Sequence, residues 1–91
     1  MLKLETTGQF RRDYKKMMKR GYDRTLLEKV VDILLAEKTL PAKYRDHALT
    51  GNYTGFRECH IQPDWLLIYQ IQKGELVLTA FRTGPHSDLF Y

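Results

Sequence analysis

The chain has 91 residues, of which 43% are hydrophobic and 29% are charged. A chain of this size buries one small core, so we expect a single domain over residues 1–91 and exclude a second. No apolar run approaches the roughly 18 residues of a membrane span, and residues 1–5 lack the layout of a signal peptide. These features favour a cytoplasmic protein with no membrane partner. The lone Cys59 cannot form an internal disulfide, which suits a reducing compartment.

A net charge of +4 at pH 7 suggests a polyanionic partner, and the positive charge is concentrated in one segment. Against Asp13 alone, the segment 10–20 holds the basic residues Arg11, Arg12, Lys15, Lys16, Lys19 and Arg20. A solvated helix face explains this pattern as well as a surface that contacts nucleic acid or an acidic protein. Lys15, Lys16 and Lys19 are therefore candidate substrate-binding residues.

The first half of the chain predicts a short strand followed by a helical hairpin. Residues 2–4 alternate between apolar and polar, as in a strand. A first helix is expected over residues 7–21, with an apolar stripe made of Phe10, Tyr14, Met17 and Met18. A second helix begins at Asp23 or Thr25 and is closed by Pro41, with an apolar stripe made of Leu26, Leu27, Val30, Val31, Leu34 and Leu35. Both stripes are expected to lie in the core.

The second half predicts strands, because the hydrophobic period changes to two after an irregular segment at residues 43–52. The expected strands are 55–61, 65–71 and 76–83, separated by short turns. The element order is then β-α-α-β-β-β. We predict an α+β fold in which the helical hairpin packs on a mainly antiparallel sheet.

Polar residues at the ends of these strands form a candidate site. On the last strand, alternation places Arg82 in a row with Leu76, Leu78 and Ala80, so its guanidinium is expected at the rim beside the Gly-Pro turn. His60 ends the first of the three strands. Asp64 follows in a tight turn, where a purely structural turn role explains it equally well.

These residue types suit metal-independent cleavage of RNA. RNA supplies its own 2′-hydroxyl nucleophile, so the reaction needs a base, an acid and positive charge near the phosphate. His47, His60, His86 and Asp64 would transfer protons, and Arg82, with Arg57 or Arg45, would supply the charge. A zinc site is the competing interpretation, but the chain lacks the usual close ligand pairs, so no metal or cofactor is expected. Histidines that only make local hydrogen bonds are a further alternative.

Segments 46–51, 55–69 and 81–90 closely resemble the YafQ-type mRNA interferases, a branch of the RelE/ParE toxin superfamily. The resemblance rests on a DH-x-L-x-G turn, an H-x-x-P-D-W run and an R-T-G-x-H-x-x-L-F tail. It implies a RelE-like fold and the toxin of a type II toxin–antitoxin pair, which enters the ribosomal A site and cuts mRNA without a metal. It also implies a RelB/DinJ-type antitoxin, with operator DNA bound only through the antitoxin complex.

The resemblance also assigns roles to residues of this chain. The positions that match the active-site pattern of the family are His47, His60, Asp64, Arg82, His86 and Phe90. It implies His86 as the general acid, Asp64 or His60 as the base, Arg82 as the phosphate ligand and His47 as an orienting group. Phe90 would stack on a base. Trp65 matches the pattern too, but its strand setting favours a core role.

Other functions of the same superfamily fold remain alternatives. A ParE-like toxin would bind and inhibit DNA gyrase without nuclease chemistry, and fold alone does not separate the two activities. An inactive relative that serves only as the partner of a regulator is a third interpretation. The complete set of histidines, with Asp64 and Arg82, favours the nuclease, because a toxin that only binds does not need it.

Overall fold

The computed structural model describes residues 1–90, and Tyr91 lies outside the described residues. The helices and strands are β1 (Lys3–Thr6), α1 (Gly8–Lys19), α2 (Arg24–Leu35), β2 (His47–Ala48), β3 (Arg57–Gln62), β4 (Trp65–Gln72), β5 (Val77–Gly84) and α3 (His86–Phe90). Short 3₁₀ turns lie at η1 (Ala42–Tyr44), η2 (Gly51–Tyr53) and η3 (Lys73–Glu75). The α+β class and the predicted β-α-α-β-β-β order are confirmed. The sequence patterns missed β2 and α3.

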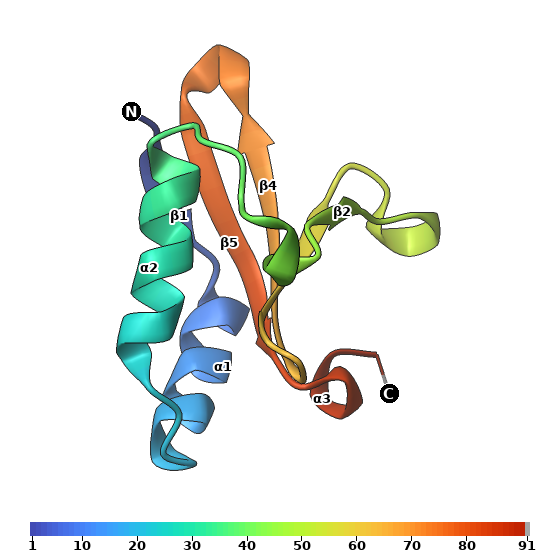
Figure 1. Ribbon diagram of the computed structural model, residues 1–91. Helices are drawn as coiled ribbons and strands as arrows, with labels where there is room; N and C mark the ends of the chain where they lie inside the picture. Colours follow the sequence, from blue (N-terminus) through green and yellow to red (C-terminus); the bar gives the residue numbers. More distant parts are fainter. Residues whose placement is uncertain (91) are drawn as a thin grey trace.

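The strands of residues 1–90 form one sheet in the order β1-β5-β4-β3-β2. β1 runs parallel to β5, and every other pairing is antiparallel, as the prediction of a mainly antiparallel sheet required. Figure 1 shows α1 and α2 on one side of the sheet and α3 on the other. The helical hairpin and α3 therefore lie on opposite faces of the sheet.

Side-chain caps set the starts of the two long helices. The Thr7 hydroxyl accepts a hydrogen bond from the Phe10 amide at 2.9 Å, and the Asp23 carboxylate accepts one from the Thr25 amide at 2.9 Å. Asp23, rather than Thr25, is thus the cap of α2. The prediction that this helix continues to Pro41 is wrong, because the chain leaves the helical conformation earlier, at Glu37, whose φ of 59° is left-handed.

The larger core fills the space between the sheet and the helical hairpin. Phe10 and Met17 from α1 and Leu27, Val30 and Leu34 from α2 pack there against β3, β4 and β5. A smaller apolar cluster lies on the opposite face of the sheet and consists of Leu66, Ile68 and Leu89, with Leu49, Tyr53, Phe56 and Phe81 packed against it. Burial on both faces explains the continuous apolar run of β4.

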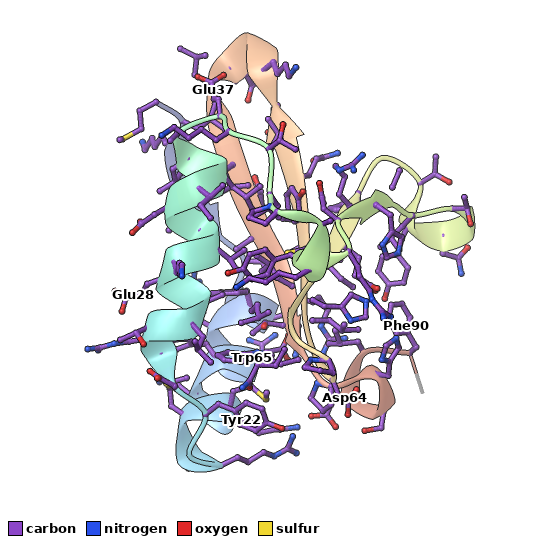
Figure 2. The ribbon with its side chains drawn as sticks, in the orientation of Figure 1. Tyr22, Glu28, Glu37, Asp64, Trp65 and Phe90 are labelled. Atoms are coloured by element: carbon purple, nitrogen blue, oxygen red, sulfur yellow. The ribbon has the colours of Figure 1, made fainter. Side chains whose placement is uncertain are left out.

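Trp65 is fully buried, so the predicted core role is confirmed. Its indole N–H donates to the Thr83 hydroxyl at 2.9 Å, and that hydroxyl donates to the Leu66 carbonyl at 2.7 Å. Figure 2 shows Trp65 on the side of the helical hairpin, next to Tyr22. The residue that precedes it in the chain, Asp64, lies on the side of α3.

A bulge in β5 overturns the predicted row of side chains along this strand. Ala80 pairs with Tyr69, but Arg82 pairs with Ile68, so Phe81 is an extra residue in β5. A one-residue insertion reverses the alternation of side chains. Arg82 therefore lies on the face opposite to Ala80, the face of the smaller cluster. Leu76 precedes the strand and is 55% exposed, so it does not belong to the row either.

Candidate active site

The smaller-cluster face of the sheet carries a row of aromatic rings contributed by separate elements. His47 comes from β2, His60 from the end of β3, and His86 and Phe90 from α3. The ring centroids of His47 and His60 are 6.4 Å apart, those of His60 and His86 6.0 Å, and those of His86 and Phe90 5.8 Å. The structure thus brings together the three histidines and the aromatic residue that the sequence pattern singled out. Figure 2 shows Phe90 on this side of the molecule.

Cross-strand register places further polar residues in the same region. His47 pairs with Glu58, Glu58 with Ile68, and Ile68 with Arg82, so the four share one face of the sheet. Arg82 reaches this face only because of the bulge in β5. The register of β2, β3, β4 and β5 therefore decides which of the candidate residues lie on the side of the histidines.

Glu58 is the site residue that the sequence analysis missed. Its side chain is only 5% exposed, and one carboxylate oxygen, Oε1, lies 3.6 Å from Nε2 of both His47 and His60. The sequence did offer one signal for Glu58. It is an acidic residue in the middle of a predicted strand, two positions before His60. Without β2, however, nothing in the pattern placed His47 beside it.

Backbone carbonyls hold the other ring nitrogen of each of these histidines. His47 Nδ1 lies 2.7 Å from the Arg45 carbonyl, and His60 Nδ1 lies 3.1 Å from the Pro63 carbonyl. A carbonyl only accepts hydrogen bonds, so we assign the hydrogen of each neutral ring to Nδ1. Nε2 then carries the lone pair in both rings and is the atom that takes up a proton.

Asp64 holds His86 at the start of α3. Its Oδ1 accepts a hydrogen bond from the His86 amide at 3.1 Å and lies 3.3 Å from His86 Nδ1. The backbone and side-chain hydrogen bonds from His86 lower the pKa of Asp64 below its ordinary value, so the carboxylate is ionised at neutral pH. Asp64 therefore does more than close the turn, because it gives a protonated His86 a negatively charged neighbour.

The Arg82 guanidinium makes a two-point ion pair with Asp13 of α1. Nε and one terminal nitrogen lie 3.0 Å from the two carboxylate oxygens, and the Thr83 amide donates to the same carboxylate at 3.2 Å. The hydrogen bonds that Arg82 donates to the Asp13 carboxylate raise the pKa of Arg82. The guanidinium is therefore permanently charged and held at the sheet edge, with part of its charge balanced by Asp13.

Arg57 and Arg45 occupy different settings. Arg57 donates to both oxygens of Asp46 at 3.4 and 3.2 Å, and Asp46 also accepts a hydrogen bond from the Tyr69 hydroxyl. The pKa of Tyr69 is raised mainly by burial and also by the contact with Asp46, so the phenol stays protonated. Arg57 thus braces the segment that leads into β2. Arg45 is exposed and lines a cavity of about 480 Å³ that also borders His60.

The basic residues of α1 border the C-terminal tail, α3, on the side opposite to the histidine row. Lys16 and Arg20 approach the Asp88 carboxylate of α3, at 4.0 and 3.0 Å. Lys15 and Lys19 are exposed and line a shallow groove together with Tyr14 and Tyr22. Of the three candidate lysines, Lys16 is therefore paired with an acidic residue, whereas Lys15 and Lys19 border an open surface.

Residues 1–90 form neither a metal-binding cluster nor a membrane-spanning helix. In that range, no cluster of three or more histidine, cysteine, aspartate or glutamate side chains has the geometry to hold a metal ion. The helices described there are all too short or too polar to span a bilayer. The groups that the site does offer are three histidines, their carboxylate neighbours and nearby arginines, which is a set suited to proton transfer beside an anionic substrate.

A family model described as "Bacterial toxin of type II toxin-antitoxin system, YafQ" matches residues 2–91. The chain belongs to the YafQ toxin family. The mRNA interferase toxin YafQ of Escherichia coli K12 is 39% identical over 88 residues, which cover 96% of this chain and 94% of that protein. The family membership inferred from the three sequence segments is thereby confirmed.

Solved structures agree with this YafQ-family fold. A metal-bound toxin from Helicobacter pylori is 50% identical, with a TM-score of 0.94, and the match covers 99% of this chain and 100% of that one. YafQ in the E. coli DinJ-YafQ complex is 37% identical, with a TM-score of 0.90 and complete coverage of both chains. The YafQ-family toxin described here therefore has the RelE-like architecture expected from its sequence.

Proposed function

We propose that this YafQ-family toxin is a ribosome-dependent endoribonuclease that cuts mRNA in the ribosomal A site by general acid/base catalysis without a metal ion. The observation that carries the proposal is the row of His47, His60 and His86, in which the first two share the Glu58 carboxylate and the third lies beside Asp64. The name of the E. coli relative, mRNA interferase toxin, supports the same activity. The whole row lies on one face and within reach of an exposed aromatic side chain, Phe90.

The tautomers and ion pairs suggest how the proton transfers are divided. Nε2 of His60 or His47 takes the proton of the 2′-hydroxyl, and the 2′-oxygen then attacks the adjacent phosphorus. His86, with Nδ1 on the Asp64 side, donates from Nε2 to the departing 5′-oxygen. Because the pKa of Asp64 is lowered, we assign Asp64 to the support of His86 rather than to the base. Each such transfer contributes about 10²–10⁴-fold to the rate.

The charged and aromatic residues around the row would hold the RNA. Arg82, on the histidine face, and Arg45, beside the cavity at His60, are placed to attract phosphate oxygens. Arg57 acts indirectly by holding Asp46 and the start of β2. Phe90, which is 39% exposed, offers a ring face to a base. Lys15, Lys16 and Lys19 would contact ribosomal RNA or an acidic partner through long-range attraction.

We propose a DinJ-type antitoxin as the protein partner of this chain, with operator DNA reached only through that complex. The support is the E. coli relative, which was solved as a DinJ-YafQ complex and superposes over the full length of both chains. The ribosome and its bound mRNA are the other proposed partners. Their support is the concentration of positive charge on α1, since ribosomal RNA is a polyanion.

Primer extension on a reporter mRNA after brief induction of the toxin tests this function. Wild type should produce new cuts within translated codons, and His86→Ala should produce none, while thermal unfolding and antitoxin binding stay the same. Ser87→Ala, a neighbouring exposed position on α3, is the matched control and should cut like wild type. Growth arrest by wild type without any cuts would instead favour a toxin that binds DNA gyrase. An equally active His86→Ala protein would exclude His86 as the acid.

A chelator experiment tests metal independence on the same substrate. Cleavage by purified toxin on programmed ribosomes should continue after a transition-metal chelator is added, with Mg²⁺ retained to keep the ribosome intact. Loss of cleavage that added zinc or copper restores would contradict the proposed mechanism. The metal-bound state of the H. pylori relative makes this comparison necessary.

A further inference from the structure

Glu58 is a buried carboxylate whose only ion-pair partners within residues 1–90 are two histidines. Its side chain is 5% exposed, and the same oxygen, Oε1, faces Nε2 of His47 and Nε2 of His60 at 3.6 Å. A buried charge without a cation is strongly destabilising, so such groups are normally paired. Within the described part of the chain, no lysine or arginine pairs with Glu58, which leaves a protonated histidine as its natural counter-ion.

The hydrogen-bond pattern of the rings shows when that counter-ion forms. In the neutral state each ring gives its single hydrogen to a backbone carbonyl through Nδ1, at 2.7 Å for His47 and 3.1 Å for His60. Nε2 then has no hydrogen to share with Glu58. Protonation of Nε2 creates a positive ring with the carboxylate already beside it. The site is therefore arranged for the charge that a general base acquires, not for the charge it starts with.

We propose that Glu58 is a positioning residue that stabilises the imidazolium formed when His60 or His47 accepts the proton of the RNA 2′-hydroxyl. In that step the O–H bond breaks, the Nε2–H bond forms, and the 2′-oxygen bonds to phosphorus as the bond from phosphorus to the 5′-oxygen breaks. The 5′-oxygen takes the proton from His86. Glu58 remains ionised and does not touch the RNA. The proposal rests on the proposed nuclease function and adds the group that makes its base effective.

Other charged groups near the row face different partners. Asp64 and His86 pair with each other at the start of α3. Asp46 and Arg57 form an ion pair on the β2 side, at 3.2 Å, and Arg45 is exposed. On β4, the residue paired with Glu58 is the apolar Ile68. Glu58 is thus the carboxylate that the register places next to Nε2 of both His47 and His60.

Histidine-ring NMR measures the interaction without any nuclease assay. In the wild-type toxin the ¹⁵N shifts should identify His47 and His60 as the Nδ1–H form when neutral. In the acid form of Glu58→Gln, the Nε2 ¹⁵N signals of His47 and His60 should move from their wild-type positions, since the neighbouring carboxylate is gone, and those of His86 should be unchanged. Glu75→Gln alters an exposed carboxylate in η3 and should match wild type. Identical Nε2 signals of His47 and His60 in Glu58→Gln and wild type would overturn the proposal.

Single-turnover cleavage on programmed ribosomes, followed from about pH 5.5 to 8.5, tests the consequence for the base. Glu58→Gln should cut about tenfold more slowly at neutral pH, with the acidic limb of the profile moved to lower pH. Glu58→Asp should recover part of the rate, and Glu75→Gln should retain all of it. A slower reaction with an unmoved limb would indicate a purely structural role and would overturn the proposal. If wild type makes no cuts but the NMR shift is present, the nuclease function fails and the Glu58–histidine coupling stands.

Discussion

Phe90 occupies the outer end of the ring row, where its ring contacts two others. It meets His86 at 5.8 Å between ring centroids and Tyr53 at 5.8 Å, yet it remains 39% exposed. Those contacts orient the ring, and we expect its exposed part to stack on a base. A residue that served only the core would be buried, as its neighbour Leu89 is.

Phe90→Ala should therefore reduce cleavage more than it reduces stability. Base–aromatic stacking is worth about 1–3 kcal/mol, so the rate at limiting toxin concentration should fall about tenfold or more. Phe90→Trp should retain most of the activity, because it keeps a stacking surface. Single-turnover cleavage measures the rate, and Leu76→Ala, another exposed apolar position at the far end of β5, is the control. A Phe90→Ala toxin that cuts at the wild-type rate would remove the stacking role.

At the scale of elements, one ion pair fastens α1 to the bulged end of β5. Asp13 accepts hydrogen bonds from Arg82, Gln9 and the Thr83 amide. Burial alone would raise the pKa of Asp13, but these hydrogen bonds together bring it below its ordinary value. This ion pair holds α1 in place and also fixes the position of the Arg82 guanidinium, which we assign to phosphate binding.

The stability of the toxin should accordingly depend on pH through Asp13. The folded-state pKa of Asp13 lies below its unfolded-state pKa. The contribution of Asp13 to the free energy of unfolding is therefore complete above about pH 5 and is lost as the pH falls through the folded-state pKa. Asp13→Ala should lower the free energy of unfolding at pH 7 by about 3–5 kcal/mol, because it leaves the guanidinium unpaired. Urea unfolding at neutral and acid pH measures both effects. Asp32→Ala on α2, which lacks this pairing, serves as the control, and an equal loss in both variants would contradict the prediction.

The charge distribution acts at the scale of the whole molecule. The net charge is +4, and Lys15 and Lys19 stand on an exposed face of α1 that is separate from the histidine row. We expect such a surface to attract ribosomal RNA through its charge. Lys16 differs, since the acidic side chain of Asp88 already lies near it at 4.0 Å.

Lys15→Glu combined with Lys19→Glu should weaken ribosome binding and reduce its dependence on salt. Each lost phosphate contact should lower the slope of log K against log salt by about 0.7–0.9 between roughly 50 and 200 mM salt. Binding to purified ribosomes across this range measures the slope. Lys73→Glu, an exposed lysine in η3, changes the net charge without touching α1 and is the control. An unchanged slope in the double variant would exclude this face from the ribosome contact.

Local patterns were enough for the existence of the two long helices, for the long strands and for the identity of most candidate residues. The helical stripes, the caps and the period-two segments each depend on neighbours only a few residues away, which the sequence displays directly. The motif segments also identified the histidines, Asp64 and Phe90, which lie together in the structure. Their catalytic roles stay predictions until the variants above are measured.

The sequence by itself determined the family, the α+β class and the residue types available for proton transfer, because these follow from composition, periodicity and short motifs. Only the tertiary structure decided how those residues are paired. The two-residue strand β2 places His47 opposite Glu58, and the bulge in β5 turns Arg82 to the histidine face and next to Asp13. Both features depend on contacts between residues far apart in the chain, and a shift of one residue in either register would send these side chains to the other side of the sheet.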